Sequence, residues 1–385
     1  MDIKSSDIEK IVKEVLASIT GAGSAPAKAA GPIPAKSKAA MLTELEKFEI
    51  KEFPIPEIGD DDILVKVEGC GVCGTDIEAY RHGIVKPVIV LGHENVGTVY
   101  EVGEGVTKYK VGDRVLCGPP SYCAEGCSAC KTGKPNICAY GFPRTNGIGG
   151  PDGGFAEYML VGDVDHTMII PVPEGVDIKD AVLFDVICVS LHAIRKSNFK
   201  FGDNVVISGG GPIGLAAIQI AKAAGARKVV VLETNDAKFP RLMEYGADHC
   251  INVRTCENIG AEVRKVLGTP DGADVTFECS GSQASLLTCV FDCAKNGSQV
   301  VLVGIVGEPL SQLSLAPVIP REIDFISSFV YTPEEIEMYL DMLAAGKIKF
   351  PGMVTDIIGL DDVVEKGVAR KDRTGQLKIL LDPSL

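Results

Sequence analysis

The pattern of hydrophobic and polar positions changes twice along this chain of 385 residues. From about residue 39, short alternating runs such as ILVKVEGCGV and NVGTVYEVG are bounded by glycines, which is typical of β strands. A longer apolar run after residue 180, AVLFDVICVSLHAIRKS, predicts a helix. Strand-like and helix-like runs then alternate from residue 204 to 304, which predicts a parallel, doubly wound sheet. A last helix is expected at 333–346 and a last strand at 376–381.

The first 37 residues follow a different pattern. Apolar side chains between residues 6 and 19 recur at helical spacing and form one stripe, and Ser6 with Glu9 fits a capping box. Residues 21–37 are rich in Gly, Ala and Pro and predict a flexible linker. A single amphipathic helix cannot bury its stripe alone, so we expect it to dock on another molecule. Packing of this helix on its own domains is the alternative.

Composition narrows the class of protein. With 46% hydrophobic and 23% charged residues, the chain has the profile of a globular protein of two domains. A formal net charge of −14 disfavours nucleic acid as a partner. We expect no secretory signal, because the first ten residues are acidic, and no membrane segment, because glycines and a proline interrupt the longest uncharged run. Thirteen cysteines, an odd number, favour metal sites or buried thiols in a reducing cytoplasm over disulfides.

A glycine-rich loop, SGGGPIGL, joins the first strand and first helix of the α/β region. In its G-x-G-x-x-G spacing the first glycine turns the chain, the second admits a pyrophosphate and the third packs helix against strand. Glu233 ends the next strand, where a carboxylate accepts ribose hydroxyls and repels a 2′-phosphate. We therefore predict NAD rather than NADP, although Lys238 nearby leaves some tolerance for NADP. The predicted cofactor contacts are Gly209, Gly211, Pro212, Ile213, Gly214 and Glu233.

Cys73 and the adjacent pair His93 and Glu94 lie in one glycine-rich segment, residues 69–97. Thiolate, imidazole and carboxylate are the ligand types of catalytic zinc, where three protein ligands leave one position open. Glycines at both ends of the segment let a backbone approach a bound ion closely. The alternative to a metal site is a buried cysteine and a core histidine that merely fall close together.

A second set of cysteines is denser. Four of them lie within sixteen residues, in CAEGCSACKTGKPNIC. Four thiolates complete the tetrahedral shell of a structural zinc and leave no position open for chemistry. The predicted ligands of this structural zinc are Cys123, Cys127, Cys130 and Cys138.

From about residue 39 to its end, the chain resembles the zinc-dependent medium-chain alcohol and polyol dehydrogenases. The matching segments are GCGVCGTD at 69–76, GHENVG at 92–97, the four-cysteine lobe, GGFAEY at 153–158, GGGPIG at 209–214, ECSG at 278–281 and REIDF at 321–325. The resemblance implies a GroES-like catalytic domain at 38–187 and 322–385, with the zinc lobe at 117–140, and a Rossmann domain at 188–321. It also implies a homo-oligomer, either a dimer or a tetramer.

The resemblance implies a ligand set for a catalytic zinc. Cys73 and His93 match the family's zinc ligands, and Glu94 matches a ligand that can bind or stay in the surrounding shell. Asp185, at the start of a predicted helix, matches the remaining ligand of secondary alcohol dehydrogenases. A carboxylate that only begins the helix is the alternative for Asp185.

The implied reaction is hydride transfer from a small alcohol or polyol to NAD, or the reverse reduction of an aldehyde or ketone. Thr75 matches the family's proton-relay hydroxyl, although it could instead stabilise only the turn. Asp76 is expected to orient the ring of His93, as ligating imidazoles require. The predicted catalytic residues are thus Thr75, Asp76 and Glu94.

Two features depart from the family. Three residues, rather than the usual two, separate Cys123 from Cys127. Residues 1–37 have no counterpart, and they look like the peptides that lead enzymes into bacterial microcompartments. This similarity implies a shell protein or co-encapsulated enzyme as a partner of residues 1–20, a microcompartment within the cytoplasm as the location, and NAD recycling as the purpose.

Two other functions stay open at this point. A catalytically silent NAD-binding subunit of the same fold would lack zinc, whereas the enzyme is expected to hold about two zinc ions per chain. Oxidation of an amino alcohol, as in threonine dehydrogenases, is the alternative within the enzyme class. No residue pattern identifies the substrate.

Overall fold

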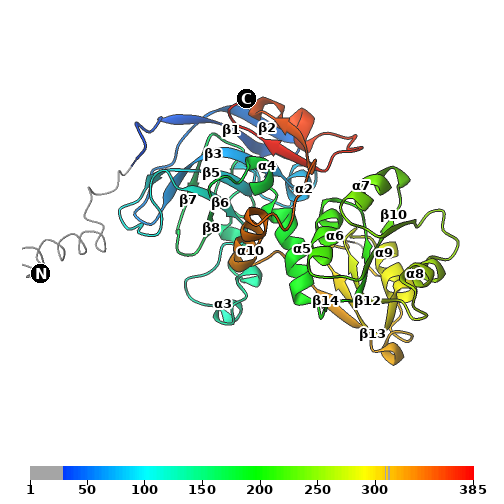
Figure 1. Ribbon diagram of the computed structural model, residues 1–385. Helices are drawn as coiled ribbons and strands as arrows, with labels where there is room; N and C mark the ends of the chain where they lie inside the picture. The colour runs from blue at the N-terminus through cyan, green and yellow to red at the C-terminus, as the bar shows by residue number, and fades with distance from the viewer. Residues whose placement is uncertain (1–28, 308, 311–312) are drawn as a thin grey trace, which may run out of the picture.

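The computed structural model describes residues 29–307, 309–310 and 313–385. Two domains lie side by side, one built on antiparallel β sheets and one on a parallel sheet flanked by helices (Figure 1). Helix α5 (Phe184–Lys196) lies between them and connects the end of the first domain to the second. The change in hydrophobic pattern along the sequence therefore corresponds to a change of domain.

The β-rich domain contains two sheets. A small sheet has the order β2-β1-β4, and a larger one has the order β15-β16-β3-β5-β6-β8, with β7 paired to β3. Its pairings are antiparallel except for β15 with β16. The strands are β1 (Lys36–Glu44), β2 (Lys47–Pro54), β3 (Ile63–Val72), β4 (Ile89–Val90), β5 (Glu94–Val102), β6 (Arg114–Gly118), β7 (Tyr158–Val161), β8 (Met168–Pro171), β15 (Val354–Ile358) and β16 (Lys378–Leu381).

The second domain confirms the predicted doubly wound sheet. Six parallel strands have the order β11-β10-β9-β12-β13-β14, so the chain winds outward from β9 in both directions. Fully buried valines and isoleucines fill β9 and β10, as expected for strands covered by helices on both faces. The strands are β9 (Asn204–Ser208), β10 (Lys228–Glu233), β11 (His249–Asn252), β12 (Ala273–Glu278), β13 (Ala294–Leu302) and β14 (Asp324–Ser327).

The helices pack the two domains together. A single hydrophobic core contains Leu116 of the β-rich domain, Ile187 of α5 and Ile218 of α6, so it continues across the domain boundary. The α helices are α2 (Gly74–His82), α3 (Ser128–Lys131), α4 (Ile178–Ala181), α5, α6 (Pro212–Ala223), α7 (Phe239–Glu244), α8 (Ile259–Leu267), α9 (Gln283–Thr288) and α10 (Pro333–Ala344). Shorter turns are the 3₁₀ segments Pro135–Ile137, Phe142–Arg144, Asp236–Lys238, Ile319–Arg321 and Leu360–Asp362, and the π-helical segments Cys289–Cys293 and Val363–Val368.

The observed elements refine the predicted boundaries. Strand β14 pairs with β13, so the parallel sheet continues past the limit predicted at residue 321. The predicted linker is partly attached to the β-rich domain, because Ala30 N donates to Tyr100 O at 2.8 Å and Tyr100 Oη donates to Pro32 O at 3.0 Å. The predicted helix at 6–19 lies outside the described residues. Within those residues, no helix is both long enough and apolar enough to cross a membrane.

Candidate functional site: a mixed metal-donor cluster between two domains

Four predicted metal ligands come together where the domains meet. Donor atoms of Cys73, His93, Glu94 and Asp185 all lie within 4.8 Å of one another. Cys73 follows β3 and caps α2. His93 directly precedes β5 and Glu94 begins it, and Asp185 stands in the first turn of α5. The long stretch between Glu94 and Asp185 is thus closed by the packing of α5 against the β-rich domain.

Glycines make the close approach of these side chains possible. A Cβ added at Gly71 would stand 1.8 Å from Glu94 Oε2, so any side chain there would displace the carboxylate. Gly92 has a φ of +95°, and a Cβ there would stand 2.5 Å from the ring of Phe155. The glycines of this segment therefore keep space for the donor residues.

The cluster has the electrostatics of a cation site. Its groups are deeply buried: His93 Nδ1 has Asp76 Oδ1 at 3.5 Å but no hydrogen bond among the described residues, and Glu94 Oε2 has the ammonium of Lys378 beside it. Burial raises the pKa of Glu94 to about 8 even though Lys378 stands beside it, and the nearby Asp185 adds to this shift. Buried acidic groups crowded together in this way are costly unless positive charge balances them. Thiol, imidazole and carboxylate donors at this spacing fit zinc.

Asp76 and Thr75 contact the segments that carry the donor residues. Asp76 Oδ2 accepts a hydrogen bond from Cys73 N at 2.8 Å, and Oδ1 accepts one from Gly92 N at 3.3 Å. The same Oδ1 lies 3.5 Å from His93 Nδ1. Thr75 Oγ1 lies 3.7 Å from Cys73 Sγ and lines the adjoining cavity. Asp76 therefore ties the Cys73 and His93 segments together at a position where it can orient the ring.

Two residues at the cluster were missed by the sequence analysis. Lys378 of β16 forms a fully buried ion pair with Glu94. Tyr331, which is also fully buried, donates a hydrogen bond of 2.6 Å from Oη to Asp185 Oδ1. Neither residue lies near a donor motif, and the sequences around them, FVYTP and QLKILL, give no signal of a metal site.

The four-cysteine lobe forms a second cluster. The sulfurs of Cys123, Cys127, Cys130 and Cys138 lie within 4.8 Å of one another. Two of the separations are 3.8 Å, from Cys123 to Cys130, and 3.9 Å, from Cys127 to Cys138. Zn–S bonds of about 2.3 Å place the sulfurs of a tetrahedron about 3.8 Å apart. The three-residue spacing after Cys123 is thus compatible with a closed zinc site.

Protonation in the lobe also points to a cation. Backbone N–H groups of Cys130 and Ala139 point at the Cys127 sulfur and lower the pKa of that thiol to about 6. Loss of hydration raises the pKa of Cys130 to about 12. Thiols this close cannot all ionise without a positive charge between them, and a metal supplies that charge.

The glycine-rich loop borders a cavity of about 460 Å³ on the parallel sheet. A Cβ at Gly214 would meet Gly209 O at 1.8 Å, which shows how closely helix α6 packs on the loop. A Cβ at Gly211 would enter open space within the rim of the cavity. Glu233 accepts from Gly210 N at 2.9 Å and from Lys238 Nζ at 2.9 Å, so the carboxylate faces the loop.

A larger cavity of about 620 Å³ joins the donor cluster to the second domain. Cys73, His93 and Asp185 line one end of it, and Ile213 of the glycine-rich loop lines another part. Ile213 is thus the predicted cofactor contact that lines this cavity, whereas Gly209, Gly211 and Glu233 line the cavity of about 460 Å³. Pro212 follows the loop as the first residue of α6, where a missing N–H costs nothing.

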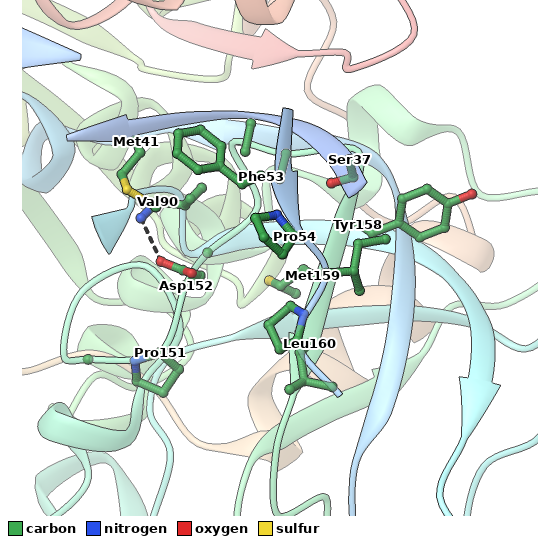
Figure 2. Close-up of a pocket in the computed structure, with 16 residues that line it drawn as sticks. Ser37, Met41, Phe53, Pro54, Val90, Pro151, Asp152, Tyr158, Met159 and Leu160 are labelled. Atoms are coloured by element: carbon green, nitrogen blue, oxygen red, sulfur yellow. Dashed lines mark hydrogen bonds between the residues drawn. The ribbon is translucent and has the colours of Figure 1, made fainter. Parts of the chain in front are cut away.

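Figure 2 shows a separate cavity, of about 300 Å³, beside β1 and β2. Phe53, Pro54 and Met159 contribute apolar walls, and the only carboxylate, that of Asp152, accepts a hydrogen bond from Val90 N at 2.8 Å. None of the described residues of the two metal-donor clusters lines this cavity.

Comparisons with known proteins agree with this geometry. Residues 59–174 match the family model of the alcohol dehydrogenase GroES-like domain, and residues 212–345 match that of zinc-binding dehydrogenases. Sorbitol dehydrogenase of Bacillus subtilis strain 168 is 30% identical over 91% of this chain and 99% of its own length. The predicted GroES-like and Rossmann domains are thereby confirmed.

Solved structures show the same relationship. A Sinorhizobium meliloti 1021 protein described as a zinc-binding dehydrogenase, bound to NADP, superposes with a TM-score of 0.82 at 32% identity, over 91% of this chain and 100% of that one. The 2R,3R-butanediol dehydrogenase of Bacillus subtilis superposes with a TM-score of 0.80 at 28% identity, over 90% and 99% of the two chains. The chain therefore belongs to the zinc-binding, medium-chain alcohol and polyol dehydrogenases, and it is an oxidoreductase.

Proposed function

We propose that this protein is an NAD- and zinc-dependent dehydrogenase that interconverts a small alcohol or polyol with its aldehyde or ketone. The observation that supports the proposal is the cavity between the domains, which borders both the cluster of zinc-type donors and Ile213 of the nucleotide-binding loop. The family relationship supports the same reaction class, since the relatives include sorbitol and butanediol dehydrogenases.

The zinc and the nicotinamide supply Lewis-acid chemistry and a hydride acceptor when they are bound. Cys73, His93 and Asp185 would hold the metal, because all three also line the cavity where a substrate oxygen must enter. Glu94 would be a conditional ligand, since its ion pair with Lys378 competes with metal binding. Four cysteines in the lobe would hold a second, structural zinc.

Thr75 is the proposed proton carrier. Its hydroxyl lines the cavity close to Cys73, so it can take a proton from a substrate hydroxyl and pass it toward solvent. Asp76 does not line the cavity and would act through His93 as a positioning residue. Tyr331 would position Asp185 in the same way.

NAD is the proposed cofactor. The hydrogen bonds that Glu233 accepts from Gly210 and Lys238 hold its carboxylate beside the glycine-rich loop. A 2′-phosphate in this place would face that negative charge, whereas ribose hydroxyls could donate to it. The NADP-bound relative shows that the fold also accepts the phosphorylated cofactor, so NADP is the comparison to make.

The test combines metal analysis with initial rates. We expect about two zinc ions per chain and chelator-sensitive NADH formation with at least one alcohol from a panel of alcohols, diols and polyols. Absence of zinc from the purified protein would instead support the silent, NAD-binding subunit. A marked preference for threonine over every simple alcohol would support the amino-alcohol alternative.

The N-terminal extension carries a separate part of the proposal, namely delivery to a bacterial microcompartment and NAD recycling there. Its support is the sequence pattern of residues 1–37. Because Ala30 and Pro32 contact Tyr100, a clean deletion should end at residue 28. We expect the shortened enzyme to keep its turnover and lose co-purification with shell proteins. A soluble but inactive product would contradict the proposal that the extension serves only as a tether.

Size measurement of both forms would also test the proposed dimer or tetramer.

A further inference from the structure

Several exposed apolar side chains line the proposed substrate cavity. Five large hydrophobic residues that are at least half exposed to solvent all line this one cavity: Ile84 at 53%, Ile137 at 50%, Phe142 at 53%, Ile305 at 81% and Phe329 at 51%. Large apolar groups left open to water around one cavity mark a surface that an apolar ligand covers. Val189, Val303 and Val330 extend the same lining.

Polar groups of the cavity are concentrated at its metal-donor end. Cys73, Thr75, His93 and Asp185 stand together there, and Cys138 belongs to the second cluster. No lysine or arginine is found among the described residues that line the cavity. A phosphorylated or carboxylated substrate would therefore lack a cationic partner.

The remaining polar side chains offer few hydrogen bonds to a substrate. Asn136 Nδ2 donates to Phe329 O at 2.8 Å, and Thr145 Oγ1 donates to Gly141 O at 3.1 Å. Ser328 Oγ is buried and has no partner among the described residues, so it could serve one additional hydroxyl. A six-hydroxyl chain would leave most of its hydroxyls without partners, at a cost for each one buried.

We infer that the preferred substrate is an apolar alcohol, or the matching aldehyde or ketone, with a hydrocarbon chain or ring and at most one further hydroxyl. This inference rests on the proposed dehydrogenase function and specifies its substrate class. The reacting oxygen sits at the donor cluster, and the hydrocarbon part covers the exposed side chains of both domains. The protein thus differs in substrate from the sorbitol dehydrogenases that it resembles in sequence.

A homologous series tests the inference on the full-length, zinc-loaded protein with NAD. From ethanol to 1-pentanol we expect kcat/KM to rise about fourfold with each added methylene, because each one buries further apolar area. Sorbitol and glycerol are expected to react at least about 100-fold less efficiently than 1-pentanol. Activity confined to polyols, or a flat series, overturns the substrate assignment while leaving the dehydrogenase function intact.

Matched variants distinguish the effect of apolar residues in the cavity wall from the effect of exposed apolar residues elsewhere on the surface. Ile137→Gln and Ile305→Gln place an amide on the cavity wall and should lower kcat/KM for 1-pentanol about tenfold or more without a comparable loss for ethanol. Ile319→Gln is the control, because Ile319 is 72% exposed but lies outside the cavity. An equal loss in all three variants would contradict the proposed walls, and unchanged melting temperatures would show that each variant is folded.

Direct binding distinguishes failure of this inference from failure of the proposed function. Saturation-transfer difference NMR on the zinc-loaded protein without NAD should show benzyl alcohol bound, and glycerol not bound, at equal concentrations. The benzyl alcohol signal should weaken in Ile305→Gln and persist in Ile319→Gln. Binding of benzyl alcohol without turnover of any alcohol would reject the dehydrogenase function alone, whereas preferential binding of glycerol would reject the apolar substrate.

Discussion

The two cysteine-containing clusters of this protein are built in opposite ways. The lobe takes all four of its thiols from one short segment, Cys123 to Cys138, and three of them are partly exposed. The mixed cluster takes its donors from three places in the chain, from Cys73 to Asp185, and buries His93 and Glu94. One cluster is local and near the surface, and the other depends on the packing of two domains.

The difference teaches which kind of cluster can perform chemistry. Four thiolates complete a tetrahedral zinc shell, so a zinc ion in the lobe can stabilise the fold but has no open position for a substrate. The mixed cluster borders a cavity and includes Glu94, whose ion pair with Lys378 gives it an alternative to metal binding. An open position and a spacious cavity are what a catalytic zinc needs.

The largest effect should come from removing a thiolate at the mixed cluster. Cys73→Ala is expected to lower kcat/KM by at least about 1000-fold, since a metal's stabilisation of charge is worth several kcal/mol. The variant should still fold, because the four cysteines of the lobe are unchanged in it. Initial rates, zinc content and circular dichroism check the prediction, and a variant with full activity would show that the Cys73 thiol is not needed for catalysis.

A pair of carboxylate variants should separate the resting ligand from the conditional one. Asp185→Asn is expected to weaken zinc binding at the mixed cluster by about 100-fold or more, and Glu94→Gln by about tenfold or less. The reason is that Asp185 faces the cavity, whereas Glu94 is paired with Lys378. Zinc competition titrations measure both values, and the reverse order would exchange the two roles.

Loss of the lobe metal should have a smaller and different effect. In Cys127→Ser we expect one zinc to be lost, the melting temperature to fall and kcat/KM to drop about tenfold, mainly through KM. The lobe affects KM because Ile137, which ends one of its 3₁₀ segments, and Phe142, which begins the next, line the substrate cavity. Thr132→Ser, in the same lobe, is the control that keeps its hydroxyl. A variant that lost the zinc but kept its KM would show that the lobe does not influence substrate binding in the cavity.

The smallest effect on stability is expected from the contacts that link the four-cysteine lobe to α5, the helix that carries Asp185. Asn136 of the lobe meets His192 of α5 at 3.3 Å, and His192 Nδ1 lies 3.0 Å from the carboxylate of Glu335 in α10. Burial alone would raise the pKa of Glu335, but hydrogen bonds from His192 and Thr332 outweigh it and lower the pKa. The charged carboxylate therefore contributes stability above its unfolded pKa near 4.5, and this contribution is lost as the pH falls through the lower folded pKa.

Glu335→Gln should accordingly reduce the free energy of unfolding by about 1–2 kcal/mol at pH 7. The difference from the unchanged protein should shrink below about pH 4.5, as the Glu335 carboxyl of the unchanged protein becomes neutral in the folded state as well as in the unfolded state. Urea unfolding at several pH values measures this, with the neighbouring exposed Glu334→Gln as a control expected to change stability by about 0.5 kcal/mol or less. A deficit that stayed constant with pH would show that packing, rather than charge, is responsible.

The sequence by itself determined the local features of this protein. The glycine-rich loop, the four-cysteine lobe and the segment from Cys73 to Glu94 could be predicted, because each one is contained within a short stretch whose spacing follows from its chemistry. The order of strand-like and helix-like runs was likewise enough to predict the parallel sheet. Asp185 came only from resemblance to a family, since no spacing rule connects it to Cys73.

Only the tertiary structure decided what surrounds the donors. Lys378 and Tyr331 reach the mixed cluster from the last part of the chain, through the pairing of β16 with β3 and the return of the chain after β14. The substrate cavity likewise takes its apolar walls from both domains and from the lobe. Contacts between distant segments depend on how whole elements pack, and a pattern of neighbouring residues does not contain that information.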